Sequence, residues 1–315
     1  DIGDEAHWAQ GEGDALLATQ DGPVPAPAQT DPPPEAGPAT QATEEPEAPA
    51  PADDTLPDPS PETAPDTAQD TAPETEDAPA PAEAVEITRQ GDGLNLRGTG
   101  AGDTLLGSAG QDAVFGRDGD DTLTGLAGND FLEAGAGDDR AEGGDGDDVL
   151  RGRDGDDRLA GGAGADDLDG GDGDDSLRGG AGDDRLQGGS GADHLQGGAG
   201  SDSLGGGADS DTDTLDGGAG DDRLHLHAGD LATGGHGGDL FALHGPDTPQ
   251  PALAEITDFD PDADRLELVY DGGPPPEVSA TEEAGDTLIY ADGAAVLRLT
   301  GVTGFDTAAV SLVAA

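Results

Sequence analysis

The amino-acid sequence predicts an all-β protein whose centre is a parallel β-roll, a solenoid in which short strands stack along a rod. Three observations predict this fold class: a period of nine residues, Gly at fixed places in each period, and one apolar residue per period. From Gly98, twelve consecutive blocks keep one register through Gly205. The first and fourth positions are Gly in eleven blocks each, the sixth is Asp in all twelve, and the eighth is Leu in ten. Such strict phase indicates a structural repeat.

Each block combines a turn with a short strand. In the block that begins at Gly179, six turn-forming residues precede Arg185-Leu186-Gln187, which can extend. Leu186 then points to one side of the strand and its two neighbours to the other. Two blocks make a coil with a strand on each side, and stacked coils pair their strands in parallel. We therefore expect a thin interior filled by a column of Leu, in about six coils spaced roughly 4.8 Å apart.

The region before the repeats differs sharply in composition. Residues 1–88 hold 22 Asp or Glu and no Arg or Lys, and 17 of the 24 Pro lie between Pro23 and Pro81. So few apolar residues cannot offset the entropy of ordering the chain. We expect residues 1–88 to be a disordered, acidic, Pro- and Ala-rich linker that precedes the β-roll of residues 89–242.

The region after the repeats is more apolar. Strand-like runs occur at 265–270, 287–290 and 295–300, and Asp-Gly and Gly-Pro turns separate them. Residues 243–315 are therefore expected to form a C-terminal β cap.

The charge of the chain restricts its partners. The formal net charge is −59, and all 12 basic residues are Arg. Nucleic acid is excluded as a partner because phosphate binding depends on basic surface, and an anionic membrane surface is disfavoured for the same reason. No segment approaches the roughly 20 apolar residues that a membrane span requires. The chain has no Cys, which excludes disulfides and Cys-based zinc sites.

The sixth-position Asp residues point to a hard cation. Stacking brings these carboxylates to one coil spacing, where each pair repels by roughly 1 kcal/mol in water. A divalent cation bound between successive coils would replace this repulsion with a net attraction. Calcium takes roughly six to eight oxygens from carboxylates and main-chain carbonyls, whereas magnesium demands stricter octahedral geometry. We predict calcium ligands at Asp103, Asp112, Asp121, Asp130, Asp139, Asp148, Asp157, Asp166, Asp175, Asp184, Asp193, Asp202, Asp211 and Asp222.

The pattern Gly-Gly-x-Gly-x-Asp-x-Leu-x resembles the calcium-binding nonapeptide of the repeats-in-toxin (RTX) family. The resemblance implies a right-handed parallel β-roll with several calcium ions bound between turns on the same side. Paired Asp residues, such as Asp139 with Asp157 or Asp166 with Asp184, and carbonyls of the Gly-rich turns would hold each ion. Early blocks depart from the pattern at Thr99, Ser108, Arg117 and Leu126 in the second position and at Ala101 in the fourth.

The C-terminal region carries a second resemblance. The segments ITDFDP at 256–261 and DRLEL at 264–268 resemble the segment that caps the β-roll in serralysin-type metalloproteases and related secreted proteins. This resemblance implies an uncleaved signal for type I secretion in residues 243–315, with the type I machinery as a partner. It also implies a bacterial, extracellular protein that folds outside the cell. Extracellular calcium modules bind at about 10⁻⁴–10⁻³ M, and binding energy becomes folding energy where no site exists beforehand.

These observations favour a secreted, non-enzymatic calcium-binding protein. The sequence contains neither H-E-x-x-H nor G-x-S-x-G. Two alternatives remain: a carrier and secretion module of a larger extracellular protease, lipase or epimerase, and a surface adhesin or matrix protein. A repetitive ligand such as polysaccharide or ice is disfavoured, because the outward seventh and ninth positions form no regular ladder.

Two further metal patterns are weaker. Asp209, Asp211 and Asp213 alternate as in an EF-hand loop, but Thr214 and Gly220 stand where that loop needs Gly and Glu, so an interrupted nonapeptide is favoured.

Four histidines also lie close together in the sequence. His225 and His227 alternate on an expected strand, with His236 and His244 nearby. Zinc is the alternative interpretation, and separate surface or turn histidines are favoured over it.

Overall fold

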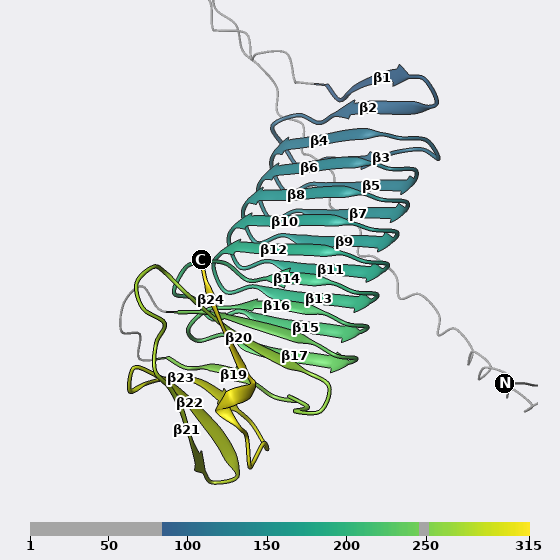
Figure 1. The fold of residues 1–315 in the computed structure, drawn as a ribbon. Coiled ribbons are helices and arrows are strands. Elements are labelled where there is room, and N and C mark those ends of the chain that lie inside the picture. Colours follow the sequence, from purple (N-terminus) through teal and green to yellow (C-terminus); the bar gives the residue numbers. More distant parts are fainter. Residues whose placement is uncertain (1–83, 246–251) are drawn as a thin grey trace, which may run out of the picture. The chain divides into compact units, whose positions relative to one another are not determined.

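The computed structural model describes residues 84–245 and 252–315, which form a parallel β-roll of about eight turns and a C-terminal β module (Figure 1). The predicted all-β class is confirmed. The expected disordered linker lies outside the described residues up to residue 83; the first strand already begins at Glu86. No helix in the described part of the chain is long and apolar enough to cross a membrane.

Two sheets form the long sides of the roll, and the chain alternates between them (Figure 1). The first sheet contains, in spatial order, β1 (Glu86–Gln90), β2 (Gly93–Arg97), β4 (Ala113–Asp118), β6 (Phe131–Ala136), β8 (Val149–Asp154), β10 (Asp167–Asp172), β12 (Arg185–Ser190), β14 (Ser203–Gly205), β16 (Arg223–Leu226), β18 (Leu240–His244), β20 (Arg265–Tyr270) and β24 (Val310–Ala314). The second contains β21 (Val278–Glu283), β22 (Asp286–Ala291), β23 (Ala294–Leu299), β19 (Ala254–Ile256), β17 (Leu231–His236), β15 (Thr214–Ala219), β13 (His194–Ala199), β11 (Ser176–Ala181), β9 (Arg158–Ala163), β7 (Arg140–Asp145), β5 (Thr122–Ala127) and β3 (Thr104–Leu106).

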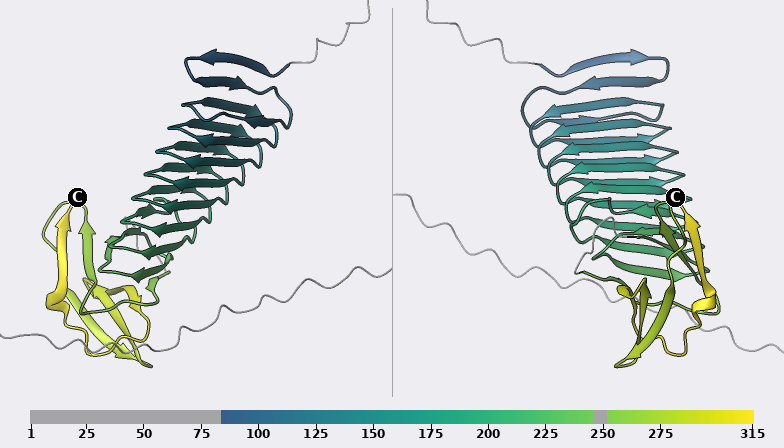
Figure 2. Two further views of the ribbon diagram at one scale, coloured as in Figure 1. Left: turned by 90° about the vertical axis from the view of Figure 1, so that its right-hand side faces the viewer. Right: turned by 60° about the vertical axis from the view of Figure 1, so that its left-hand side comes forward.

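The strand register confirms the two-block coil. Leu168 of β10 pairs in parallel with Leu150 of β8 on one side and with Leu186 of β12 on the other. The successive coils are visible edge-on in Figure 2. The eighth-position side chains form one continuous buried column between the two sheets, from Leu105 to Leu204. Burying a Leu side chain contributes about 1.5–3 kcal/mol, so this thin column supplies most of the hydrophobic stabilisation of the roll.

Close stacking explains why Gly recurs in the turns. Gly180, in the second position, has φ +124°, and a Cβ there would lie 2.1 Å from the carbonyl oxygen of Gly162 in the preceding coil. Arg117, Leu126 and Arg153 occupy the same position with φ values of 92°, 88° and 97°. The stacked coils therefore impose a left-handed conformation that side chains disfavour.

Leu126→Gly should relieve this strain. We expect the variant to raise the free energy of unfolding of the calcium-saturated chain by up to about 1 kcal/mol, because the left-handed conformation costs a non-Gly residue roughly 1–2 kcal/mol and Gly loses more entropy on folding. Leu126 is 46% exposed, so little packing is lost. Urea unfolding measures the change. Leu106→Gly is the control, an exposed Leu without positive φ, which should become less stable. Equal destabilisation of both variants would contradict the claim that the left-handed conformation of Leu126 is strained.

The C-terminal module continues both sheets. Strand β20 pairs in parallel with β18, and β19 pairs in parallel with β17. The antiparallel strands β21, β22 and β23 then extend the second sheet beyond β19. The predicted strands at 265–270, 287–290 and 295–300 correspond to β20, β22 and β23. The rings of Phe241, Phe259 and Phe305 pack in series, with centroids 5.9 and 5.8 Å apart.

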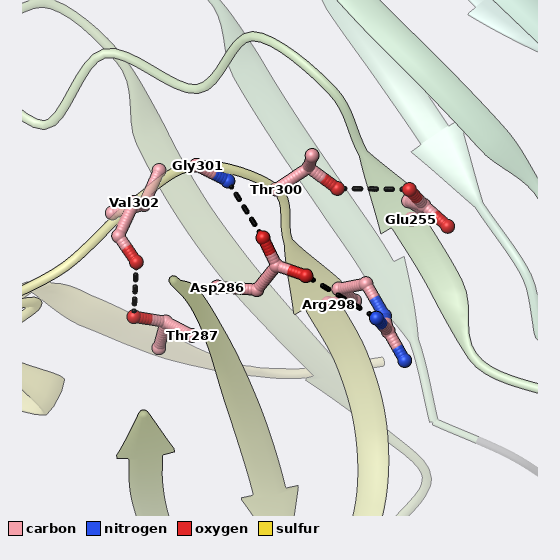
Figure 3. Close-up of polar contacts among 7 residues, drawn as sticks. All are labelled: Glu255, Asp286, Thr287, Arg298, Thr300, Gly301 and Val302. Atoms are coloured by element: carbon pink, nitrogen blue, oxygen red, sulfur yellow. Dashed lines mark hydrogen bonds and ion pairs between the residues drawn. The ribbon is translucent and has the colours of Figure 1, made fainter. Parts of the chain in front are cut away.

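Polar contacts fasten the hairpin of the module (Figure 3). The carboxylate of Asp286 accepts hydrogen bonds from Gly301 N at 2.9 Å and from Arg298 Nη1 at 3.2 Å. Thr300 Oγ1 donates to Glu255 Oε1 of β19 at 2.8 Å. These bonds join β22 and β23 to the strand that continues the roll, so the module is built onto the last coil.

Candidate metal centre

The sixth-position Asp residues form two columns, one along each edge of the roll, which are buried except at Asp103 and Asp264. In each column the backbone N–H of one Asp donates to Oδ1 of the next, with N···O distances between 2.6 and 3.2 Å. The first column contains Asp103, Asp121, Asp139, Asp157, Asp175, Asp193, Asp213 and Asp230. The second column contains Asp112, Asp130, Asp148, Asp166, Asp184, Asp202, Asp222, Asp239 and Asp264.

The second carboxylate oxygen, Oδ2, distinguishes the middle of the columns. In eleven column residues Oδ2 is buried and accepts no hydrogen bond from any described residue. They are Asp121, Asp130, Asp139, Asp148, Asp157, Asp166, Asp175, Asp184, Asp193, Asp202 and Asp222. A buried anionic oxygen without a partner costs free energy. These eleven oxygens are therefore the strongest structural sign that a cation belongs in the columns.

A first-position Gly lies beside ten of these eleven oxygens, and Ala134 takes that position in the block of Asp139. A Cβ on Gly170 would lie 2.1 Å from Asp175 Oδ2 and 2.6 Å from the carbonyl oxygen of Gly188 in the next coil. The first-position Gly therefore leaves a space where carboxylate and carbonyl oxygens converge, which is the donor set that calcium takes. Among the described residues, no three His, Cys, Asp or Glu side chains form a metal-binding group by themselves. A column site thus needs main-chain carbonyls as well as Asp, and the residues present fit calcium.

Burial changes the acidity of the columns. Desolvation is the largest cause and neighbouring carboxylates add to it, while the hydrogen bond from the preceding backbone N–H opposes both. The pKa is raised to about 7 at Asp148, Asp157, Asp175 and Asp213. It is raised to about 6 at Asp139, Asp184, Asp193, Asp222 and Asp230. The metal-free roll therefore holds protons more tightly than the unfolded chain does.

Acid should consequently promote folding of the metal-free chain. Because the folded pKa values of 6 to 7 exceed the ordinary value of 3.8, the stabilisation is complete below the ordinary value and is lost as the pH rises through 6 to 7. We expect the chain in a chelator to gain β signal in far-UV circular dichroism between pH 7.5 and about 5. The calcium-loaded chain is the control, since protons compete there with the cation. Loss of structure on acidifying the metal-free chain would contradict the prediction.

One predicted column position is corrected. Asp211 is exposed, whereas Asp213 is 1% exposed and its Oδ1 accepts the backbone N–H of Asp193 at 3.0 Å. The block is two residues longer than the others, and the extra residues lie in the turn before β15. Every column Asp precedes a buried interior residue by two positions, and counting back from Leu215 would have identified Asp213.

Besides Asp213, three further column residues were not predicted from the sequence. Asp230, Asp239 and Asp264 continue the columns beyond the regular repeats. They precede the buried residues Ala232, Phe241 and Leu266 by two positions. The same counting rule finds them, although the Gly pattern around them is degenerate.

Three of the four neighbouring histidines gather on the first sheet. His225 Nδ1 lies 3.2 Å from His244 Nε2, and the His227 ring stacks on His244 with centroids 5.0 Å apart. Together they line a cavity of about 330 Å³. His236 is on β17 in the other sheet. The expectation that the four histidines lie apart is therefore correct only for His236.

The hydrogen bonds of this His cluster assign its tautomers. Arg223 Nε donates to His225 Nε2 at 3.2 Å. A neutral imidazole has one donor and one acceptor nitrogen, so His225 Nδ1 carries the proton and donates to His244 Nε2. Burial lowers the pKa of His225 to about 4, which keeps the ring neutral. His225 and His244 are thus a hydrogen-bonded pair with the His227 ring stacked on His244, and among the described residues no complete metal-binding group exists there.

A family model of known proteins matches the repeats that contain these columns. The family model of the RTX calcium-binding nonapeptide repeat (4 copies) matches residues 97–132, 115–150, 124–159, 133–168, 142–177, 178–212 and 212–230. No curated protein matches the chain. Among solved structures, the extracellular lipase LipA from Serratia marcescens is similar at 21% identity and a TM-score of 0.23, over 65% of this chain and 39% of the lipase chain. The present chain thus spans well under half of that lipase.

The matched segments overlap, together cover residues 97–230 without a gap, and contain most residues of both columns. The resemblance of the nonapeptide blocks to RTX repeats is confirmed, and calcium is the cation that such repeats bind. Residues 97–230 of this chain are RTX calcium-binding nonapeptide repeats, folded as a β-roll.

Proposed function

We propose that the chain is a secreted bacterial protein in which calcium between successive Gly-Asp turns drives folding outside the cell. The observation that carries the proposal is the set of eleven buried, unpaired Oδ2 oxygens. With calcium in place, each oxygen gains a cation in an environment of low dielectric. Without calcium, the columns hold like charges that burial penalises. Calcium binding and folding are therefore one equilibrium.

The proposed ligands are the column residues with an unpaired Oδ2, from Asp121 to Asp222, with Asp213 completing the first column. Neighbours within a column, such as Asp139 with Asp157 or Asp166 with Asp184, would share an ion with carbonyls of the Gly-rich turns. Calcium supplies positive charge there and performs no chemistry. We propose that the roll is non-catalytic, because its buried carboxylates are fixed to backbone N–H groups as ligands.

Export in an unfolded state is consistent with the affinity that such sites have. Extracellular calcium modules bind at about 10⁻⁴–10⁻³ M, so the chain would fold only where calcium reaches this concentration. The segment that resembles the serralysin-type cap runs from Ile256, the last residue of β19, into β20, and both strands continue the roll. We propose that residues 243–315 also carry the signal that the type I secretion machinery reads.

Trypsin provides a direct test, because all 12 Arg lie at residue 89 or beyond and the chain has no Lys. Backbone held in stacked strands resists cleavage, whereas an unfolded chain does not. At about 1 mM calcium we expect the roll and cap to survive, and in a chelator to be cut at many Arg residues. Equal protection in both conditions would refute calcium-driven folding. For secretion, the full chain should leave bacteria that express a type I exporter, and deletion of residues 243–315 should retain it inside.

A further inference from the structure

The ends of the two columns differ from their middle. In the first block, Asp103 Oδ2 accepts hydrogen bonds from Thr99 N at 2.6 Å and from Thr99 Oγ1 at 2.9 Å. In the second block, the carboxylate of Asp112 accepts one hydrogen bond from Ser108 N and another from Ser108 Oγ at 3.0 Å. Each column thus begins with an Asp whose carboxylate already holds a main-chain donor and a hydroxyl donor.

The turn backbone changes at the same two places. Thr99 and Ser108 occupy the second position of their blocks, and neither has a positive φ. Arg117 and Leu126, in the next two blocks, are not Gly either, but they keep φ values of 92° and 88°. The Asp residues of those two blocks, Asp121 and Asp130, have the unpaired Oδ2. Where the second-position residue is left-handed, as at Arg117 and Leu126, the Asp of that block has an unpaired Oδ2. Where the second position is Thr or Ser without a positive φ, the backbone N–H and the hydroxyl of that residue both donate to the Asp carboxylate.

The far ends are closed in a similar way by main chain alone. Asp230 Oδ2 accepts the backbone N–H of His227 at 2.6 Å. Asp264 Oδ2 accepts the backbone N–H of Asp260 at 2.8 Å. Hydrogen bonds to a carboxylate stabilise its charged form, which removes the need for a cation at that oxygen.

We propose that Thr99 and Ser108 take the place of calcium at the start of the columns, so that Asp103 and Asp112 hold no metal ion. Calcium is confined to the part of the roll between the closed ends, and Asp230 and Asp264 are likewise metal-free. The proposal rests on calcium binding by the middle of the columns. It removes Asp103 and Asp112 from the fourteen calcium ligands expected from the sequence. At both ends of each column, hydrogen bonds from the chain itself pair the Asp carboxylate, so no cation is needed there.

The number of bound calcium ions tests the proposal, measured by native mass spectrometry of the full chain at saturating calcium. Asp112→Asn should bind as many ions as the unsubstituted chain, although it loses stability. Asp148→Asn, two coils further along the same column, should bind at least one ion fewer. If Asp112→Asn loses ions as Asp148→Asn does, the proposal is overturned. If the unsubstituted chain binds no calcium, the proposed function fails instead.

A converse variant tests the role of the hydroxyl. Ser108→Gly removes both the Oγ donor and the side chain that disfavours the left-handed turn, which restores the second-position Gly of the regular block. We expect Ser108→Gly to bind one calcium ion more than the unsubstituted chain. An unchanged ion count would overturn the assignment of Ser108 as the group that replaces calcium.

Discussion

Gly180→Ala should destabilise the stacking of the central coils. The Cβ would lie 2.1 Å from the Gly162 carbonyl oxygen, and φ at this position is +124°. The left-handed conformation costs roughly 1–2 kcal/mol and overpacking a further 1–3 kcal/mol, so we expect a loss of about 3 kcal/mol. Because folding and binding are coupled, the calcium concentration at the folding midpoint should rise, as circular dichroism would show.

Gly100→Ala is the matched control for that variant. Nothing lies within 4 Å of a Cβ at Gly100, and its φ is not positive. Its midpoint should equal that of the unsubstituted chain. If Gly180→Ala also folded at the unsubstituted midpoint, the coils could not be stacked as closely as the structure has them.

Asp175→Asn should weaken calcium binding more than any change on the surface. Asn keeps an oxygen that can accept the N–H of Asp157, now 2.8 Å from Oδ1, but removes the charge of the unpaired Oδ2. Calcium affinity depends on the number of charged ligands, so we expect the apparent dissociation constant to rise by roughly tenfold or more. Isothermal titration calorimetry would measure it.

The neighbouring residue offers a close control. Asp174 is exposed, and its Oδ1 accepts the backbone N–H of Ala192 at 2.9 Å. Asp174→Asn makes the same chemical change one residue away and should shift the dissociation constant far less. Equal effects in both variants would mean that calcium responds to total charge and not to the buried columns.

The regular blocks were predictable because one rule governs them all. Leu or a smaller apolar residue must enter the interior every nine residues, and the Asp two positions earlier then falls in a column. The coil and the parallel register follow from this spacing, as Leu150, Leu168 and Leu186 show. Counting from the first-position Gly206 predicts Asp211 as the sixth-position Asp, which is wrong because the turn of that block is two residues longer. The interior Leu215 was the reliable marker, because burial fixes its position.

Features outside the period could not be read from it. Strand β1 pairs with β2 in an antiparallel hairpin. Its Ile87 is 62% exposed, so β1 has no buried apolar position by which the sequence could have predicted it. The His cluster joins β16 to the end of β18, and its contact depends on the register between those strands. Thr99 and Ser108 were visible as departures from Gly, but only the structure shows that their donors reach Asp103 and Asp112.

We propose that calcium in the Asp columns is what folds this roll. The most direct measurement is a calcium titration of the purified chain followed by far-UV circular dichroism, with magnesium in parallel. We expect a cooperative change from a disordered to a β spectrum at about 10⁻⁴–10⁻³ M calcium, and no such change with magnesium at the same concentrations. A β spectrum already present in a chelator at neutral pH, unchanged by calcium, would contradict it.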